Sequence, residues 1–292
     1  MTSKHEAFIQ TVKPQLLARL DTLTQFSLTD PRQQLALAMR YTLLAPSKCF
    51  RGLLLCATHS LISTDLDAIL PIACALEMMH SASLIYDDLP CMDDGTVRRG
   101  NPSSHCVFGE DTAILAGYTL QSYAYDIISR PSAFAPANQL AAIHWFGHAC
   151  GVHGIAGGQY LDLVQSKTSI PIAPVSQIHA LKTGALIEAC VYIPALLHGH
   201  PNQHALKTIG QSLGLLFQMT DDILDQTSTT AQLGKQAQQD STKKTYISDS
   251  TLAVAKEKAA KLAQDTCDGL RDLGYDDSLL TGFIHWAHDR IS

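Results

Sequence analysis

Positive charge is scarce in this sequence. Its 292 residues include 21 lysines and arginines against 27 aspartates and glutamates, which leaves a formal net charge of −6. Such a chain has no overall positive field to attract DNA, RNA or an anionic membrane surface. An anionic ligand must therefore be bound by local groups, and we expect no nucleic-acid partner.

Paired cysteine motifs and a leader segment are lacking as well. The eight cysteines are scattered without a C-x-x-C pair and mostly have apolar neighbours, which is typical of reduced thiols in a cytosolic core. Residues 1–20 mix charged and apolar side chains at helical spacing, unlike a signal peptide, and no later run approaches membrane-spanning length. These features predict a cytoplasmic protein without stable membrane insertion.

Strand-like alternation is nearly absent, whereas apolar residues recur at helical spacing along most of the chain. In TDPRQQLALAMRYTLLAP, Asp30 is placed as an N-cap, Pro31 occupies the first helical position, and Pro46 ends the helix. With 46% hydrophobic residues, the chain can bury a large core. We predict one all-α domain over residues 1–292. Further helices are predicted at 66–88, 104–129, 138–150, 178–197, 203–225, 251–273 and 278–290.

Three polar or proline-containing segments are predicted to connect these helices, at 129–138, 164–176 and 225–245. None is long or biased enough to separate two domains. The polar segment 225–245 is the best candidate for a mobile flap.

Acidic residues are concentrated in two clusters. The first, SLIYDDLPCMDDGTVRRG, ends an apolar helix, and Pro90 should break that helix so that the chain curls back. In the second, FQMTDDILDQ, Asp221 and Asp225 are one helical turn apart, so that their carboxylates lie about 5–6 Å apart on one face. Both clusters are predicted near helix C-termini, where the helix dipole and mutual repulsion disfavour carboxylates unless a cation binds them.

Clustered oxygen ligands without histidine or thiolate suit a hard cation, and few carboxylates with room for phosphate oxygens suit Mg²⁺. Arg98, Arg99, Lys182 and Lys235 would then bind the remaining phosphate charge. One acidic cluster alone is as often a solvated helix end as a site. Two together favour a metal and polyphosphate site.

Other metal and cofactor motifs fail. An EF-hand would place Pro90 and Met92 where calcium ligands belong. His144 and His148 are one turn apart, but Trp145 stands where a zinc peptidase needs glutamate, so core or surface histidines are the better interpretation. No strand precedes GIAGGQ, which excludes a dinucleotide fingerprint.

HSASLIYDDLPCMDDGTVRRG and FQMTDDILD resemble the two aspartate-rich motifs of the trans-prenyl diphosphate synthases, the family that includes farnesyl and geranylgeranyl diphosphate synthases. The first has the bacterial form of this motif, with four residues between the second and third ligand aspartates. Between the two motifs, GIAGGQYLDL and LKTGALIEACV occupy the order and spacing of the family, and the agreement spans residues 35–250. The resemblance implies an isoprenoid-synthase-like helical bundle around a deep central cavity, with the two motifs facing each other across its mouth, and a homodimer.

The resemblance also implies a reaction. Mg²⁺, three ions per site with Mn²⁺ as the alternative, would bind an allylic diphosphate and stabilise the departing group. The double bond of isopentenyl diphosphate would then attack, and proton loss would complete the condensation. The implied metal ligands are Asp87, Asp88, Asp93, Asp221 and Asp225. The implied allylic diphosphate ligands are Arg98, Lys182, Gln218 and Lys235, and Lys182 and Thr183 would lie nearest the cation. Isopentenyl diphosphate, which the family binds without metal, would take Lys48, Arg51, His80 and Arg99.

The segment APSKCFRG departs from the family pattern of two glycines, lysine, arginine, any residue, arginine and proline. Lys48 and Arg51 remain, but Cys49 replaces an arginine and Gly52 replaces the proline. A charged hydrogen bond lost there would cost about 1.5–3 kcal/mol and weaken isopentenyl diphosphate binding without abolishing the chemistry.

Product length depends on what fills the space beneath the first motif. Bacterial farnesyl diphosphate synthases typically carry a bulky aromatic residue five positions before the first aspartate, where this chain has Ala82. Met78 and Met79, one turn earlier, are flexible and would refill part of that space. We therefore expect farnesyl diphosphate as the product, with potential for geranylgeranyl diphosphate, and the preferred allylic primer stays open.

Two other functions remain as alternatives. A terpene cyclase or lyase of the same fold would lack basic homoallylic residues, so Lys48, Arg51 and Arg99 argue against it. A catalytically impaired paralogue acting as a subunit would explain APSKCFRG, but the intact aspartate motifs argue against that alternative.

Overall fold

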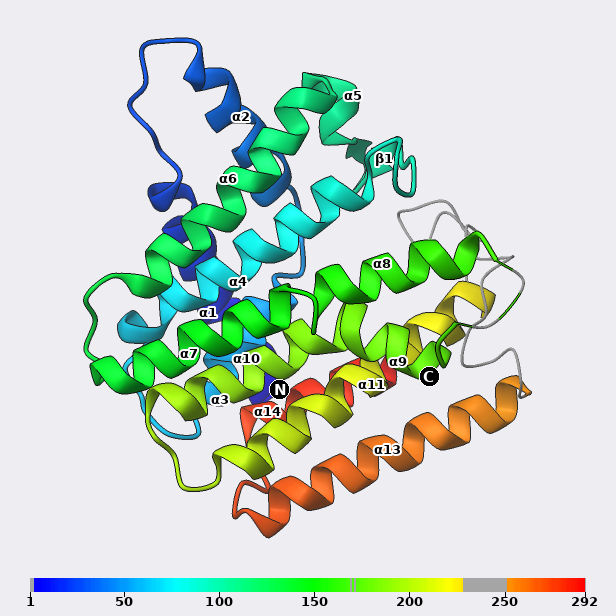
Figure 1. Cartoon of the computed structure of the whole chain (residues 1–292). Helices are drawn as coiled ribbons and strands as arrows, with labels where there is room; N and C mark the ends of the chain where they lie inside the picture. Colours follow the sequence, from blue (N-terminus) through cyan, green and yellow to red (C-terminus); the bar gives the residue numbers. More distant parts are fainter. Residues whose placement is uncertain (1–2, 169, 171, 228–250, 292) are drawn as a thin grey trace. The chain divides into compact units, whose positions relative to one another are not determined.

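The computed structural model describes residues 3–168, 170, 172–227 and 251–291 (Figure 1). Almost all regular structure in these residues is helical, which confirms the predicted all-α class. The described strands are a short antiparallel pair, β1 (Val97–Arg98) and β2 (Asn101–Pro102). All eight cysteines lie among the described residues and none is in a disulfide; six are buried, while Cys91 and Cys106 are exposed.

The chain divides into two compact units. Unit 1 comprises Met1–His5, Ala57–Thr64 and Phe134–Ser292, and unit 2 comprises Glu6–Cys56 and Asp65–Ala133. The first aspartate motif belongs to unit 2 and the second to unit 1. The single domain over 1–292 stays a prediction.

Unit 2 is organised around a helix that is apolar on all sides. α4 (Leu66–Asp87) buries most of its residues and packs mainly on α6. Gly117 of α6 allows a close contact with Tyr86 of α4. A side chain at position 117 would place its Cβ only 2.8 Å from two ring carbons of Tyr86. Asp65 caps α4 by accepting the Ala68 N–H at 3.2 Å. The other helices beginning in this unit or largely within it are α1 (Lys4–Leu23), α2 (Arg32–Leu43), α3 (Phe50–His59), α5 (Ser104–Phe108) and α6 (Glu110–Ser129).

Unit 1 is organised around α10 (Ala185–Leu197), which packs on α7 and α11. Glycines let α11 approach closely, since a Cβ at Gly210 would lie 2.9 Å from the Glu188 Cα. A Cβ at Gly214 would lie 2.8 Å from the Gly184 Cα. The remaining helices of this unit are α7 (Pro136–Cys150), α8 (Ile155–Ser166), α9 (Val175–His179), the π-helix η1 (Ala180–Gly184), α11 (Gln203–Thr227), α13 (Leu252–Asp272) and α14 (Leu279–Asp289).

Several predicted boundaries are wrong for identifiable reasons. The helix predicted over 104–129 is broken at Gly109, whose φ of 88° lies in the region that favours glycine. The helix predicted over 178–197 is instead the succession α9, η1 and α10. α2 begins one residue later than expected, so its N-cap is Pro31 and not Asp30 as predicted, although an Asp30 carboxylate oxygen still accepts the Arg32 N–H at 3.0 Å. Sequence periodicity also missed α3 and α8.

Two helical stretches, Leu66–Asp87 and Val175–Leu197, are long and apolar enough to span a membrane, although the sequence suggested that none approaches that length. Buried residues make up 72% and 67% of their most apolar windows. Helices that are apolar on all sides and buried in this way are typical of the core of a large protein.

Candidate active site

The first aspartate motif ends α4 and turns back on itself, as predicted. The Asp93 N–H donates to the Asp87 carbonyl at 2.9 Å, and the Asp94 N–H donates to the Leu89 carbonyl at 3.1 Å. Asp94 has a φ of 50°, a conformation that aspartate and asparagine tolerate better than most residues. Asp87 is half-buried and Asp93 is exposed, so ligands can reach both carboxylates.

Asp88 has a different environment from its neighbour. It is buried, and Arg98 binds it through Nη2 at 2.5 Å and Nε at 3.1 Å. Burial lowers the pKa of Arg98, but the hydrogen bond and charge of Asp88 outweigh that effect and raise the pKa overall. Arg98 was expected to bind phosphate and Asp88 to bind metal. The structure pairs them with each other, and both roles stay predictions.

The second motif lies on α11. Asp221 accepts a hydrogen bond of 2.5 Å from Nη2 of Arg290, a residue at the end of α14 that sequence reasoning missed. Asp222 is buried and accepts a hydrogen bond of 2.9 Å from Gln218 Nε2. Gln218 was expected at the allylic diphosphate, and here it orders the motif itself. Asp225 is half-buried on the same helix.

Lys182 and Thr183 lie on the π-helix η1, a rare geometry that often marks functional positions. The Lys182 ammonium forms an ion pair of 2.7 Å with Asp162 of α8. α8 approaches this turn very closely, because a Cβ at Gly158 would lie 2.2 Å from the Lys182 backbone nitrogen. The GIAGGQYLDL motif therefore supplies both the close packing and the carboxylate that hold Lys182.

Three of the residues predicted to bind isopentenyl diphosphate influence one another in unit 2. Burial, followed by the charges of Arg51 and Arg99, holds the pKa of His80 well below its usual value. His80 is therefore neutral at neutral pH and would bind a phosphate through one N–H. Arg99 has a φ of 55°, and its Nη1 donates to the Thr42 carbonyl at 3.2 Å. Lys48 is exposed.

Sequence reasoning also missed Glu77. It is 3% exposed, and its Oε1 accepts the Gly52 N–H at 2.7 Å. Burial raises the pKa of Glu77, opposed by this hydrogen bond and by the charges of Arg51 and Arg99. A signal was available, because Glu77 is the only acidic residue between Asp67 and Asp87 in an otherwise apolar helix.

The carboxylates fit magnesium by their chemistry. Within the described ranges, no group of three or more histidine, cysteine, aspartate or glutamate residues is placed to hold a metal ion. Asp87 and Asp93 in one unit, and Asp221 and Asp225 in the other, offer only oxygen ligands. Few protein carboxylates per ion suit Mg²⁺, which usually keeps waters and takes substrate phosphates as ligands. Lys235 lies outside the described residues, as does most of segment 225–245.

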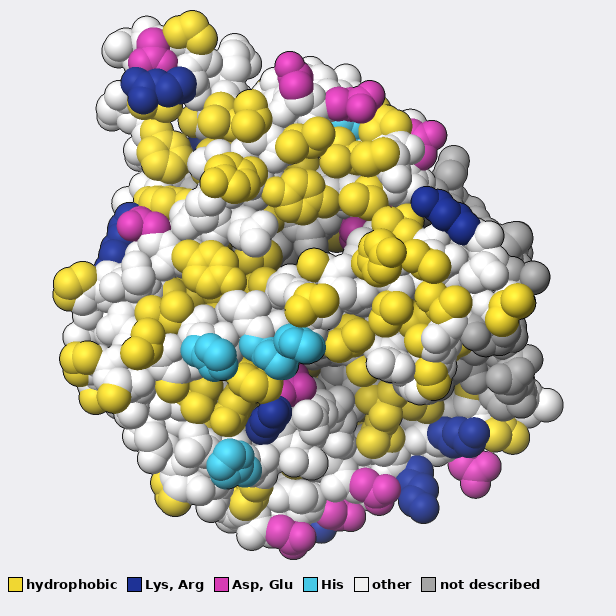
Figure 2. Space-filling model, in the orientation of Figure 1, with side chains coloured by type: hydrophobic (Ala, Val, Ile, Leu, Met, Phe, Trp, Pro, Cys, Tyr) yellow, Lys and Arg dark blue, Asp and Glu magenta, His cyan; other side chains and the backbone are white. Residues whose placement is uncertain are grey.

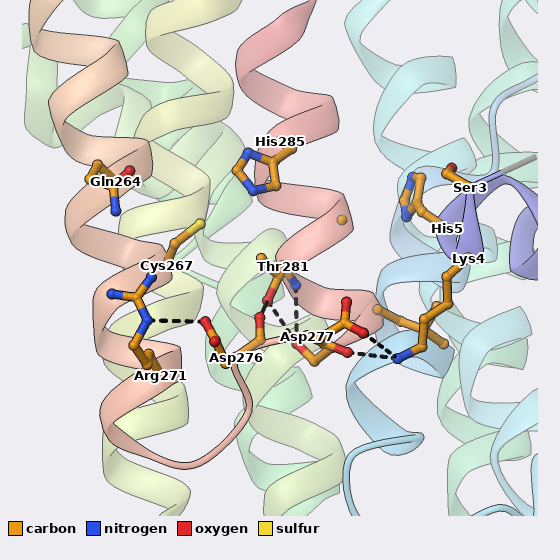
Figure 3. Close-up of a pocket in the computed structure, with 13 residues that line it drawn as sticks. Ser3, Lys4, His5, Gln264, Cys267, Arg271, Asp276, Asp277, Thr281 and His285 are labelled. Carbon is orange, nitrogen blue, oxygen red and sulfur yellow. Dashed lines mark hydrogen bonds and ion pairs between the residues drawn. The ribbon is translucent and has the colours of Figure 1, made fainter.

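Two pockets of unit 1 have none of the predicted site residues in their lining. One of about 510 Å³ is lined by the N-terminal residues, α13 and α14, and Figure 3 shows its charged groups paired with each other. Lys4 Nζ donates to the Asp277 carbonyl at 2.6 Å, and Arg271 Nε lies 3.1 Å from an Asp276 oxygen. These paired charges tie the chain's N-terminal residues and α13 to the turn before α14.

The second pocket, of about 530 Å³, contains Trp145, His148 and Lys207. The His148 ring stacks on Trp145 with centroids 4.6 Å apart, and Lys207 Nζ lies 4.0 Å from the Trp145 ring centroid. Figure 2 shows histidine side chains gathered beside a hollow on its visible face. His148 thus packs in an aromatic stack, in agreement with its interpretation as a structural histidine.

Comparison with known sequences decides the family. The sequence model of the polyprenyl synthetase family matches residues 32–268, a span that contains both aspartate motifs. This chain belongs to the polyprenyl synthetase family. The resemblance inferred from the motifs is thereby confirmed.

Individual members of the polyprenyl synthetase family are similar over most of their length. The chain is 39% identical to geranylgeranyl pyrophosphate synthase 7, chloroplastic, of Arabidopsis thaliana, over 86% of this chain and 74% of that protein. It is 37% identical to a farnesyl diphosphate synthase of Haemophilus influenzae, over 83% of this chain and 84% of that protein.

Solved structures agree. An FPP/GFPP synthase from Zymomonas mobilis in its apo form has a TM-score of 0.85 at 30% identity, with 96% of this chain and 98% of that chain covered. A Helicobacter pylori geranyltransferase complexed with magnesium and isoprenyl diphosphate has a TM-score of 0.86 at 26% identity, with 99% and 98% covered. The isoprenoid-synthase-like fold class is confirmed.

Proposed function

We propose that this polyprenyl synthetase condenses isopentenyl diphosphate with dimethylallyl or geranyl diphosphate to give farnesyl diphosphate, with extension to geranylgeranyl diphosphate. One observation supports condensation in particular. Beside its carboxylates, unit 2 gathers a separate group of basic and imidazole side chains, Arg51, His80 and Arg99. A carboxylate motif suits a diphosphate bound through metal, whereas this group suits a second diphosphate bound directly. A reaction with two diphosphate substrates needs both.

The proposed mechanism assigns roles to both units. Asp87 and Asp93 of unit 2, and Asp221 and Asp225 of unit 1, would hold Mg²⁺, which would supply positive charge to weaken the C–O bond of the allylic diphosphate. Lys182, oriented by Asp162 at 2.7 Å, donates to that diphosphate as negative charge develops on it. Arg51 and Arg99 bind and orient isopentenyl diphosphate so that its double bond is positioned to attack. The released diphosphate accepts the proton whose loss restores the alkene.

The test is incubation of purified protein with labelled isopentenyl diphosphate, geranyl diphosphate and Mg²⁺, with a chelated control. We expect labelled fifteen-carbon product that disappears on chelation. An unlabelled cyclised or eliminated product would instead identify a terpene cyclase or lyase. Unchanged substrates would favour the impaired paralogue that acts as a subunit.

Chain length gives a first prediction. Ala82 and Met78 are fully buried in α4, and Met79 is 5% exposed. The small Ala82 side chain is therefore enclosed by protein, and the two methionines one turn earlier in the helix are flexible. We expect Ala82→Tyr to remove any twenty-carbon product, because the added ring occupies volume that a longer tail would need. Mass analysis of the products measures this, with total consumption of isopentenyl diphosphate as the control. An unchanged product distribution at preserved consumption would contradict the assignment of Ala82.

We also propose a homodimer, supported by an apolar surface in unit 2. On α6, Ile114, Leu115 and Tyr118 are 45%, 53% and 64% exposed, and on the adjoining α5 Val107 is 47% exposed. Hydrophobic side chains gather over α6 in Figure 2. Contiguous exposed apolar residues of this kind mark interaction surfaces, and a twofold dimer places one such surface against its own copy.

The dimer gives a second prediction. We expect Leu115→Glu to produce a monomer by light scattering coupled to size exclusion, since it buries a charge in the proposed interface. Val254→Glu on α13, where valine is 40% exposed, is the matched control and should leave the mass unchanged. A Leu115→Glu protein of dimeric mass would rule out α6 as the interface.

A cytoplasmic location, without nucleic acid or membrane insertion, remains part of the proposal. Its support is the net charge of −6 and the burial of both long apolar helices.

A further inference from the structure

Glu77 is a buried carboxylate of unit 2 that the proposed mechanism does not use. An ionised carboxylate that is 3% exposed is costly unless donors and opposite charges surround it. The groups that meet this need are Arg51 and Arg99, both predicted to bind isopentenyl diphosphate, and the Gly52 N–H next to Arg51. A role for Glu77 in binding that substrate rests on the proposed function and deepens it.

The first contact is with the start of α3. The first N–H groups of a helix have no partner within it, and a carboxylate is favourable at that end of the helix dipole. Glu77 supplies this carboxylate from α4, accepting the Gly52 N–H at 2.7 Å and a backbone hydrogen bond from Arg51. The turn that carries Arg51 is therefore held by a side chain from another helix.

Close packing also joins Glu77 to the first turn of α3. A Cβ at Gly52 would lie 3.1 Å from Glu77 Cγ and 2.7 Å from a Leu16 methyl carbon. Proline, which the family usually has at this position, has no N–H and could not donate to Glu77. Cys49, just before the helix, has a φ of 49°. The altered segment APSKCFRG thus has its own anchor, made by Gly52 and Glu77.

Electrostatic attraction is the second link between Glu77 and the residues predicted to bind isopentenyl diphosphate. The positive charges of Arg51 and Arg99 both act on Glu77, and Glu77 in turn acts on Arg99. Arg51, Arg99 and His80 are mutually close enough that the two guanidinium charges lower the pKa of the imidazole. Without a negative charge among them, two partly buried arginines would repel each other and lose a common orientation.

We propose that Glu77 is a positioning residue for isopentenyl diphosphate: its carboxylate anchors the first turn of α3 and holds Arg51 and Arg99 in the orientation that binds the diphosphate. It does not touch the substrate and acts through these two arginines. Its negative charge repels a diphosphate in itself. The proposal is that orienting two guanidinium groups, each able to donate two parallel hydrogen bonds, outweighs that repulsion.

Glu77→Gln separates charge from shape, because glutamine keeps an oxygen for the Gly52 N–H and removes only the charge. We expect the KM for isopentenyl diphosphate to rise about tenfold or more, with kcat and the KM for geranyl diphosphate changed by less than about twofold. Calorimetric titration of isopentenyl diphosphate without metal should show the same weakening. Glu188→Gln is the matched control, since Glu188 is a largely buried carboxylate of unit 1 that pairs with Lys207 at 3.7 Å. It should leave the isopentenyl diphosphate KM unchanged.

The outcomes are distinct. An unchanged or lower KM for isopentenyl diphosphate in Glu77→Gln overturns the inference, as does an equal rise for both substrates, which would indicate a purely structural role. If Glu77→Gln does not fold, Glu77→Asp decides by the same criteria, because it keeps the charge but shortens its reach. A wild-type protein that neither binds nor elongates isopentenyl diphosphate would overturn the proposed function itself.

Discussion

Asparagine in place of Asp87 is expected to lower kcat for chain elongation by about a thousandfold or more, equivalent to about 4 kcal/mol of transition-state stabilisation. The substitution keeps the size of the side chain and removes the charge that would bind Mg²⁺. Metal charge on the leaving diphosphate is the largest expected contribution to ionisation of the allylic substrate. Product formation from isopentenyl and geranyl diphosphates at saturating Mg²⁺ measures the effect.

Asp94→Asn is the matched control. Asp94 belongs to the same motif but not to the predicted ligand set, and its φ of 50° accommodates asparagine. We expect it to keep kcat within about threefold of the wild type, because the positive φ is retained and no metal ligand is lost. An Asp87→Asn protein with a tenth or more of wild-type activity would remove Asp87 from the metal site.

The second large effect concerns Gly158. Its substitution by alanine would place a methyl group 2.2 Å from the Lys182 nitrogen, 2.6 Å from the Lys182 Cα and 2.8 Å from the Leu181 carbonyl carbon. All three are backbone atoms, so α8 or η1 must move as a whole. The ion pair between Lys182 and Asp162 would be displaced with them. We expect kcat/KM to fall by about a hundredfold or more, since a shift of about 1 Å can have that effect on catalysis.

Gly269→Ala on α13 provides the comparison. Its methyl group would meet only the end of the flexible Ile209 side chain, at 3.0 Å. Activity should stay near that of the wild type, while Gly158→Ala should also lower the midpoint of thermal unfolding by roughly 5 °C or more. Full activity of Gly158→Ala would mean that η1 can shift without affecting catalysis.

Much of the fold could be predicted from local pattern. The apolar spacing around Asp30 and Pro31 predicted α2 nearly to the residue, and the long apolar run that ends at Asp87 predicted α4. The prediction failed where a single residue changes the path, as at Gly109, or where a helix changes its hydrogen bonding, as at η1. Both changes leave the apolar spacing intact, so periodicity cannot detect them.

The candidate site also has features that the sequence predicted and features that it could not predict. Short sequence motifs predicted the positions of the carboxylates, the turn that returns Asp93 towards Asp87, and the family. The roles of the ligand residues remain predictions, because a motif carries no information about which groups bind a given carboxylate. Arg98 and Asp88, expected to bind separate parts of a substrate complex, bind each other at 2.5 Å.

By itself, then, the amino-acid sequence determined that this protein is helical, where its acidic motifs lie and to which family it belongs. Only the tertiary structure decided that Arg290 pairs with Asp221, that Asp162 holds Lys182, and that a buried Glu77 anchors Gly52. The reason is physical. Helix periodicity and turn chemistry depend on residues a few positions apart, whereas these pairs join residues 20 to 69 positions apart and form only when helices pack.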